Sequence, residues 1–390
     1  MKIGIDVRCL IEGRRTGVEE YTLNLLKNLF KIDTKNEYVL FLNSFRAPKT
    51  DLSWIEEYPN VRIKRFMYPN KLLNFLFWYL RWPKIDKMLG GADIVFLPNI
   101  IFGSVSSDAK MLVTIHDLSF ERYGETFSRK RRFWHMFINT KDICRRAAGI
   151  IAVSASTRSD LVSLYKIKAE KIDVVHSGID EKFRPIDRNT TELIQIKEKY
   201  GLPYKFILYF GTIEPRKNLI GIIRAFNQLQ SYALENNNEE MSRHSLVIAG
   251  QTGWLAGDIY AEINQSKFRD KIKIINSIPD ADKEYIFNLA SLFVYPSFFE
   301  GFGFPPLEAM RCGIPTIVSN NSSLPEIAGK GAVMVEPEKA DELYAAMKEI
   351  LLSKELQEML RAEGIKKAES FKWKNTALEF LNIIKKLAKE

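Results

Sequence analysis

The chain has 390 residues, of which 46% are hydrophobic and 27% are charged. This balance excludes a disordered chain, and the length favours two domains, each large enough to bury its own core. The formal net charge of +9 attracts nucleic acid, anionic lipid or phosphorylated substrates without distinguishing among them. Cys9, Cys144 and Cys312 are far apart and cannot all pair, so neither a disulfide framework nor a zinc site is indicated.

Apolar runs of strand length begin at the N-terminus. The first run, at residues 2–7, contains a charge and is not followed by a leader-like apolar core, so we expect a strand there and not a signal peptide. Nowhere does an apolar stretch approach the ~18 residues needed to cross a bilayer. Further strands are expected in the first half at 38–42, 61–65, 93–97, 111–115, 149–153 and 171–175.

The second half resumes this alternation after a break, because a turn glycine, Gly178, and a polar stretch indicate a hinge near 176–200. Continuous apolar strands separated by helical patterns, such as 18–30, 219–229 and 341–352, predict parallel sheets covered on both faces. We therefore expect an α/β fold of two doubly wound, Rossmann-like domains facing each other across a cleft. The predicted domains are residues 1–184 and 185–370, with an amphipathic last helix, 371–390, packing back on the first domain. The second-half strands are expected at 206–210, 245–249, 271–275, 292–295, 316–318 and 332–335.

The segment from Glu300 to Glu308 is the richest in chemistry. It follows an apolar strand, turns through two glycines and enters a helix with two prolines at early positions. A glycine turn before a helix presents backbone N–H groups to a phosphate and lets a ligand approach the backbone. Glu308, expected on the first helical turn, and Glu300, in the loop before it, would accept hydrogen bonds from vicinal hydroxyls. A capping glutamate and a solvated loop glutamate are the alternatives.

Three other loops follow predicted strands. Arg216 and Lys217 supply adjacent positive charge for a diphosphate, and the alternative is an exposed basic pair, although cations at a helix start oppose the helix dipole. His116 is either a group that moves a proton or binds a hydroxyl, or a structural histidine. Gly17 lies in the first loop, where it would let a phosphate come close to the backbone.

Asp280 and Asp282 match the DxD pattern with which many sugar transferases hold a divalent metal. They also open a predicted helix, where aspartate is common as a cap and in the first turn. We therefore assign them a structural role and predict no metal site. The sequence contains no GxxxxGK[ST] loop, HExxH or GxSxG motif.

Basic residues concentrate in two segments of the first predicted domain. Residues 61–90 contain seven lysines and arginines against one acid, and residues 121–146 contain eight against three. Aromatic residues are interleaved with them, which suits a surface that dips into an anionic lipid interface. We predict that both segments face the inner side of the cell membrane in a cytoplasmic, peripherally attached protein, and that no nucleic acid binds. The alternative is an amphipathic core helix whose exposed face is basic.

The motifs together resemble one known family. The segment 300–308, with seven residues between its glutamates, resembles the E-x7-E signature of glycosyltransferase family 4, and 211–218 resembles its phosphate-binding segment. The Ile278-Pro279-Asp280 loop, the Leu324-Pro325-Glu326 segment and Gly17 also fit, so the resemblance covers nearly the whole chain. It implies the GT-B fold, with an N-terminal acceptor domain and a C-terminal donor domain. It also implies sugar transfer with retention of configuration and without a bound metal or other cofactor.

Residue roles follow from the resemblance by position. It implies that Glu308 holds the ribose hydroxyls, that Glu300 binds the donor sugar, and that His116 lies close to the sugar and the acceptor. Glu20 departs from the family pattern, because many members carry an arginine at this position. The remaining implied contacts are to the diphosphate and the sugar: Arg216 and Lys217 on the leaving diphosphate, Gly17 in the first loop, and the backbone of Phe302, Gly303, Phe304 and Pro305.

The sequence favours a retaining hexosyltransferase that moves a sugar from a nucleotide sugar to a glycan or lipid-linked glycan acceptor in surface polysaccharide synthesis. The stretches 17–24 and 114–120 look most like bacterial mannosyltransferases that use GDP-mannose. A UDP-sugar-dependent transferase, a hydrolysing sugar-nucleotide epimerase and a non-catalytic basic membrane-binding protein are the alternatives. Since no separate nucleophile stands out, we expect front-face departure and attack rather than a covalent intermediate.

Overall fold

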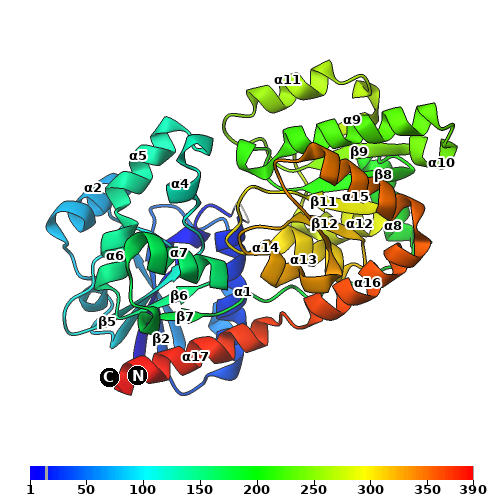
Figure 1. The fold of residues 1–390 in the computed structure, drawn as a ribbon. Helices are drawn as coiled ribbons and strands as arrows, with labels where there is room; N and C mark the ends of the chain where they lie inside the picture. Colours follow the sequence, from blue (N-terminus) through cyan, green and yellow to red (C-terminus); the bar gives the residue numbers. More distant parts are fainter. Residues whose placement is uncertain (14–15, 390) are drawn as a thin grey trace. The chain divides into compact units, whose positions relative to one another are not determined.

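The computed structural model describes residues 1–13 and 16–389, which form two compact units (Figure 1). Unit 1 consists of Met1–Leu118, Arg129–Gly178 and Lys372–Glu390, and unit 2 of Ser119–Ser128 and Ile179–Phe371. The chain therefore passes into unit 2 after Gly178 and not after residue 184. The short insertion Ser119–Ser128, which belongs to unit 2, was not expected from the sequence.

Unit 1 contains a seven-stranded sheet in the order β3-β2-β1-β4-β5-β6-β7, with every pairing parallel. The central strands are buried on both faces: Val39, Leu40 and Phe41 of the second strand have no exposed surface. This double burial explains their continuous apolar sequence. The strands are β1 (Lys2–Asp6), β2 (Glu37–Asn43), β3 (Val61–Phe66), β4 (Ile94–Leu97), β5 (Lys110–Ile115), β6 (Gly149–Ala152) and β7 (Ile172–Val174).

Helices cover this sheet, and the last one comes from the C-terminal end of the chain. The helix Gly17–Ile32 begins with a capping box in which Thr16 and Glu19 bond each other's backbone N–H. The C-terminal helix packs along it and places Phe380 against Phe96 of the sheet, with ring centroids 4.6 Å apart. The helices of unit 1 are α1 (Gly17–Ile32), α2 (Asn70–Phe75), α3 (Ile85–Met88), α5 (Arg129–Ile138), α6 (Thr140–Arg146), α7 (Ala155–Tyr165) and α17 (Trp373–Lys389).

Unit 2 contains a six-stranded parallel sheet in the order β10-β9-β8-β11-β12-β13. Its strands are β8 (Lys205–Phe210), β9 (His244–Ala249), β10 (Ile272–Ile275), β11 (Leu292–Tyr295), β12 (Thr316–Ser319) and β13 (Val333–Val335). Its helices are α4 (Ser119–Arg122), α8 (Thr191–Tyr200), α9 (Leu219–Glu235), α10 (Glu239–Ser242), α11 (Gly257–Gln265), α12 (Asp280–Leu289), α13 (Phe304–Arg311), α14 (Leu324–Ala328), α15 (Ala340–Leu352) and α16 (Lys354–Glu369).

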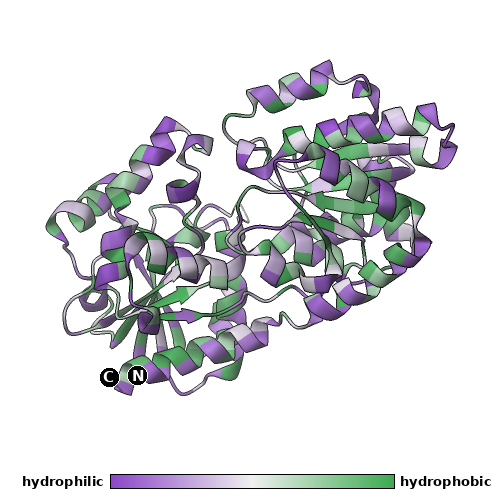
Figure 2. Cartoon of the chain, in the orientation of Figure 1, coloured by the Kyte–Doolittle hydropathy of each residue, from purple (hydrophilic) through white to green (hydrophobic). Residues whose placement is uncertain are grey.

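The predicted fold class is confirmed. Every predicted strand is present, with ends that differ by at most one residue. Figure 2 shows hydrophobic strands in both units, and helices whose outer faces are hydrophilic. Both strand orders reverse beside the first strand of the unit, between β1 and β4 and between β8 and β11. In such sheets ligands bind outside the carboxyl ends of the strands at this reversal.

Candidate active site

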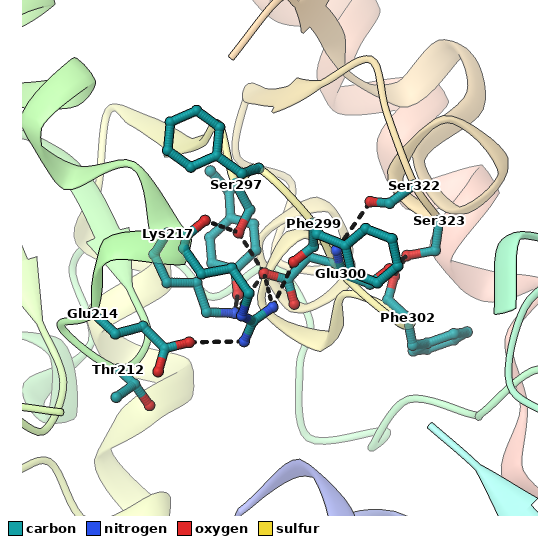
Figure 3. Close-up of polar contacts among 12 residues, drawn as sticks. Thr212, Glu214, Lys217, Ser297, Phe299, Glu300, Phe302, Ser322 and Ser323 are labelled. Carbon is teal, nitrogen blue, oxygen red and sulfur yellow. Dashed lines mark hydrogen bonds and ion pairs between the residues drawn. The ribbon is translucent and has the colours of Figure 1, made fainter. Parts of the chain in front are cut away.

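The charged residues predicted around the diphosphate and the donor sugar meet in unit 2 at this reversal point. Arg216 and Lys217 lie in the loop after β8, and Glu300 lies in the loop after β11. Figure 3 shows Lys217, Ser297 and Glu300 converging on one set of polar contacts. The parallel arrangement explains this convergence, because neighbouring parallel strands deliver their following loops to the same edge of the sheet.

Glu300 is the centre of this cluster. Its Oε1 atom lies 2.5 Å from Lys217 Nζ and 3.3 Å from Arg216 Nη1, and it accepts a hydrogen bond from Ser297 Oγ at 2.5 Å. Only 7% of the residue is exposed. Burial opposes ionisation of this carboxyl, but the charges of Lys217 and Arg216 outweigh it and lower the pKa of Glu300 to about 2. Glu300 is therefore a carboxylate at neutral pH.

Arg216 is held by the protein on two sides. Its Nη2 atom lies 2.8 Å from Glu214 Oε1, and its Nη1 atom donates to the carbonyl of Phe299 at 2.5 Å. Lys217 Nζ also donates to the hydroxyl of Tyr295 at 2.7 Å. The protein itself therefore fixes the directions of both cations before any ligand arrives.

The turn before α13 is kept in shape by Ser323. Its Oγ lies 3.0 Å from the carbonyl oxygen of Glu300 and 2.8 Å from that of Phe302, and its single O–H is shared between these two acceptors. Gly303, the N-cap of the helix, has a φ of 109°, and an added Cβ would lie 2.8 Å from the side chain of Leu324. Pro305 and Pro306 carry no N–H, so the backbone donors at this helix start are limited to residues before them. Phe304 and Pro305 themselves are half-buried at the start of α13.

Glu308 lies beyond the first turn of α13, and the expectation of a first-turn position was wrong. The helix starts at Phe304, one residue before the first proline, so its first turn carries no acid. Glu308 has no exposed surface, and its Oε1 lies 2.5 Å from Lys283 Nζ of α12. Lys283 also lies over the rings of Phe183 and Phe210, 5.4 and 5.2 Å from their centroids. In the protein alone, Glu308 is therefore a buried ion-pair partner and not a helix cap.

His116 lies in unit 1, directly after β5. Its Nε2 atom is 2.9 Å from the carbonyl of Pro98, and its ring meets Tyr21 edge-on at 4.9 Å. A carbonyl accepts only from an N–H, so this contact places the proton on Nε2 and leaves Nδ1 as an acceptor. Removal from water lowers the pKa of His116, which favours the neutral imidazole. A neutral ring with one acceptor nitrogen suits a hydroxyl partner.

The first loop is described only in part. Gly17 is the exposed first residue of α1, beside the N-cap Thr16. Arg14 and Arg15, which precede it, lie outside the described residues. The predicted role of Gly17 toward a diphosphate stays a prediction.

The two aspartates of the DxD sequence each pair with a lysine. Asp280 lies 2.6 Å from Lys182 and Asp282 lies 2.6 Å from Lys199, and both aspartates are in the first turn of α12. Within residues 1–13 and 16–389, no group of three or more histidine, cysteine, aspartate or glutamate side chains is placed to hold a metal ion.

Several residues of the site were not found from the sequence. Ser297 and Ser323 are ordinary loop serines until the fold brings them to Glu300 and Phe302. Ser322 is similar, because its Oγ accepts from the N–H of Glu300 at 3.0 Å. Lys283 is 25 positions from Glu308 and belongs to another helix. No local sequence pattern predicts any of these pairings. The serine-rich run after β12 was the one usable signal, because it lies at a strand end, where ligand-binding loops occur.

Two Rossmann-like units, with a cluster of cations and carboxylates at the strand ends of the second, place the chain in the GT-B fold class. The sucrose-phosphate synthase of Thermosynechococcus elongatus shares this fold, with a TM-score of 0.73, 19% sequence identity and 99% of each chain covered.

The family follows from sequence comparison. Residues 15–183 match the model described as Glycosyltransferase Family 4, and residues 192–367 match the model described as Glycosyl transferases group 1. Together the two models span both units, and the chain belongs to glycosyltransferase family 4.

Two relatives from Escherichia coli illustrate the similarity. The O-antigen chain mannosyltransferase B is 29% identical over 95% of this chain and 96% of its own length. The serotype-specific mannosyltransferase WbdA is 31% identical over 69% of this chain, but the match spans only 32% of that longer protein. The chain is accordingly a glycosyltransferase enzyme that binds a nucleotide sugar and an acceptor.

Proposed function

We propose that the enzyme transfers mannose from GDP-mannose to a glycan or lipid-linked glycan acceptor during surface polysaccharide synthesis. The observation that carries this proposal is the cluster of Arg216, Lys217 and Glu300 at the strand ends of unit 2. The similarity along almost the full length of a bacterial O-antigen mannosyltransferase supports the sugar.

The chemistry follows from charge. When the bond from the anomeric carbon to the diphosphate breaks, negative charge develops on the leaving oxygen, and Arg216 and Lys217 are already oriented to meet it. In the protein alone these two cations are balanced by Glu214 and Glu300. The incoming diphosphate must therefore also be met by backbone N–H groups of the turn before α13.

The carboxylate of Glu300 accepts hydrogen bonds from hydroxyls of the transferred sugar, while the carboxylate of Glu308 accepts them from the ribose. Glu300 forms ion pairs with both cations. A shift of the sugar as the bond breaks therefore also affects the positions of the groups that stabilise the diphosphate. We propose retention of configuration by attack from the face that the diphosphate leaves, without a bound metal.

A variant at Arg216 tests the phosphate assignment. In Arg216→Ala the developing charge loses one fixed donor, and we expect kcat with GDP-mannose to fall by about 10²–10³-fold. Arg224→Ala is the matched control, since Arg224 is an exposed arginine on α9 paired with Glu262. Unchanged turnover in the first variant, with both proteins folded, contradicts the assignment.

Thermal-shift measurements with a panel of nucleotides test the donor. Stabilisation by GDP and GDP-mannose, with no response to UDP, is expected. The reverse result identifies a UDP-sugar enzyme, and nucleotide release in the absence of any acceptor identifies a hydrolysing epimerase.

We further propose that the enzyme works in the cytoplasm on the inner face of the membrane, which unit 1 contacts. None of the helices in the described part of the chain is long and apolar enough to cross a bilayer. The exposed basic residues of β3 and of the first turn of α5 favour anionic lipid. We expect co-sedimentation with anionic liposomes at low salt and loss of it at high salt. Equal recovery with neutral liposomes contradicts this proposal.

A further inference from the structure

An aromatic groove lies on unit 1, in a part of the molecule that the sugar-nucleotide chemistry does not use. Its volume is ≈ 220 Å³, smaller than the ~300–1,000 Å³ of pockets for drug-sized ligands. It is formed between α2 and its continuation η3 (Leu76–Leu80), the loop after β4, and α5. The residues that line it are Asn74, Phe75, Trp78, Phe102, Trp134 and Phe137.

The walls of the groove are rings that touch one another yet remain open to solvent. Trp78 of η3 meets Phe137 of α5 edge-on at 5.5 Å, and Phe102 meets Trp134 in the same way at 6.4 Å. Trp78 and Phe137 are 44% and 47% exposed. Ile138 is the only fully buried residue of α5, so this helix is no core helix. So much exposed aromatic surface in one place marks a site of interaction.

A half-buried arginine links two parts of the groove. Arg8, the first residue of the 3-10 helix η1 (Arg8–Leu10) that follows β1, pairs with Asp6 at 2.6 Å and donates to the carbonyl of Phe102, also at 2.6 Å. It contacts Asn74 Oδ1 at 3.4 Å as well. The arginine thus ties two walls of the groove to the sheet, so the groove is a constructed feature rather than a chance gap between surface helices.

The lining specifies a hydrocarbon ligand. The polar groups of its lining are the Asn74 amide and the two indole N–H groups of Trp78 and Trp134, and Asn74 Oδ1 is occupied by Arg8. A sugar ring would find few hydrogen-bond partners there, whereas a hydrocarbon chain needs none. Each methylene of such a chain that is removed from water strengthens binding.

Positive charge lies in the first turn of each of the two helices that form the groove. Lys71 is one turn before Phe75, and Lys130 and Arg131 are one turn before Trp134, so each pair of positions shares a helix face. Lys71, Lys130 and Arg131 are all exposed. A ligand with an apolar chain and an anionic head matches this arrangement, because its phosphate meets cations while its chain lies on the rings.

The groove also lies at the functional edge of the sheet. Its elements follow β1, β3, β4 and β5, whose carboxyl ends share one edge. The loop that carries Phe102 starts at Pro98, whose carbonyl accepts from His116. The groove and the residue implied at the acceptor are therefore attached to the same loop.

We propose that this groove binds the hydrocarbon chain of a phosphorylated lipid acceptor and thereby selects lipid-linked over free glycans. This inference rests on the proposed function, since it names the acceptor class of that reaction. It differs from general membrane attachment in predicting a saturable site for a single lipid molecule, lined by Trp78 and Phe137.

Calorimetric titration with farnesyl phosphate, below its micelle concentration, tests the proposal on the full chain. We expect saturable binding at one site, weaker binding of decyl phosphate and none of inorganic phosphate or methyl mannoside. The double variant Trp78→Ala/Phe137→Ala should weaken farnesyl phosphate binding by about tenfold or more, the effect of ~1.4 kcal/mol.

The matched control is Leu80→Ala/Met136→Ala. These residues lie close in sequence to Trp78 and Phe137 and are 55% and 61% exposed, but they do not line the groove. The control should keep farnesyl phosphate affinity within about twofold, while both double variants lower partitioning into phosphatidylglycerol vesicles to a similar extent. Equal loss of farnesyl phosphate binding in the two variants, no saturable binding by the wild type, or binding of methyl mannoside at the groove overturns the proposal.

A GDP thermal shift recorded on the same proteins separates this inference from the function on which it rests. Wild-type protein that responds to GDP but not to farnesyl phosphate removes the groove proposal alone. Protein that binds farnesyl phosphate but shows no response to any nucleotide removes the donor assignment and leaves the lipid site standing.

Discussion

At Glu300 the protein keeps a carboxylate away from water and still charged, because Lys217 and Arg216 lie beside it. Lys283 and Glu308 form a second buried pair in the same unit. The two pairs differ in what surrounds them. Glu300 is served by two cations and a serine hydroxyl, whereas Glu308 faces one lysine that two aromatic rings hold in place.

The low pKa of Glu300 makes a prediction about acid stability. The carboxyl group is more acidic in the folded protein, at about 2, than in the unfolded chain, at about 4.3. Its contribution to stability is therefore present above the unfolded value and is lost as the pH falls from about 4 toward 2. The stability difference between wild type and Glu300→Gln, from urea unfolding, should be largest near pH 7 and shrink below pH 4. Glu198→Gln, an exposed position on α8, should show no such trend. A constant difference across this range contradicts the ionised state of Glu300.

The Lys283–Glu308 pair predicts non-additive substitutions. Lys283→Met leaves a buried carboxylate without its cation and should cost about 3–5 kcal/mol of stability. Combining it with Glu308→Gln should recover about 1–3 kcal/mol relative to the sum of the single changes. Urea unfolding of the four proteins measures this coupling. Strict additivity means that the two side chains do not act as a pair in solution.

At the scale of elements, the strands were predictable and their loops were not. Parallel strands that helices cover on both faces must be apolar throughout. Continuous apolar runs such as 206–210 and 292–295 therefore predict strands, although polar and apolar residues do not alternate in them. The position of Glu308 could not be predicted in this way, because its helix starts earlier than the prolines suggest. The pairing of Lys283 could not be predicted either, because its partner comes from another helix and only the packing of α12 beside α13 brings the two together. The three-residue spacing of Ser297 and Glu300 does not predict their hydrogen bond, because the bond depends on the conformation of the turn between them.

The turn before α13 depends on a glycine at its N-cap. Gly303 combines a φ of 109° with a neighbour 2.8 Å from the position of an added Cβ. Gly303→Ala should therefore lower the free energy of unfolding by about 1–3 kcal/mol and weaken nucleotide binding. Gly257→Ala is the control, since this glycine opens α11 with no atom within 4 Å of an added Cβ. Comparable losses in both variants, measured by urea unfolding, contradict the special role of the turn.

At the scale of the molecule, the last helix of the chain belongs to the first unit and completes its core. Residues of α17 are buried in unit 1, and Thr376 Oγ1 donates to the carbonyl of His176 at 2.8 Å. The segment 121–146, treated from the sequence as one basic surface, is divided: residues up to Ser128 belong to unit 2, and the basic start of α5 belongs to unit 1. Composition alone could not separate these two parts, since charge counts carry no information about which core a segment joins.

The placement of α17 predicts where a C-terminal substitution acts. Phe380 has no exposed surface and packs on Phe96 of β4. Phe380→Ala should destabilise unit 1 by about 3–5 kcal/mol, seen as faster hydrogen exchange in β1, β4 and β5 with little change in β8 to β13. Leu378→Ala, on the same helix but 44% exposed, should cost no more than about 0.5 kcal/mol. Faster exchange confined to unit 2 would contradict this assignment.

The insertion Ser119–Ser128 also limits how the enzyme can be re-engineered. Trp254 of unit 2 donates its indole N–H to the carbonyl of Thr126 at 2.6 Å and stacks on Phe127 at 5.6 Å. Tyr123 approaches Phe299, next to Glu300, at 5.8 Å. A gene fusion that exchanges residues 179–371 for the matching part of a relative would replace Trp254 and leave Thr126 and Phe127 of the insertion without this contact. In chimeras built to change donor specificity, the ten-residue insertion and residues 179–371 should therefore come from the same parent enzyme.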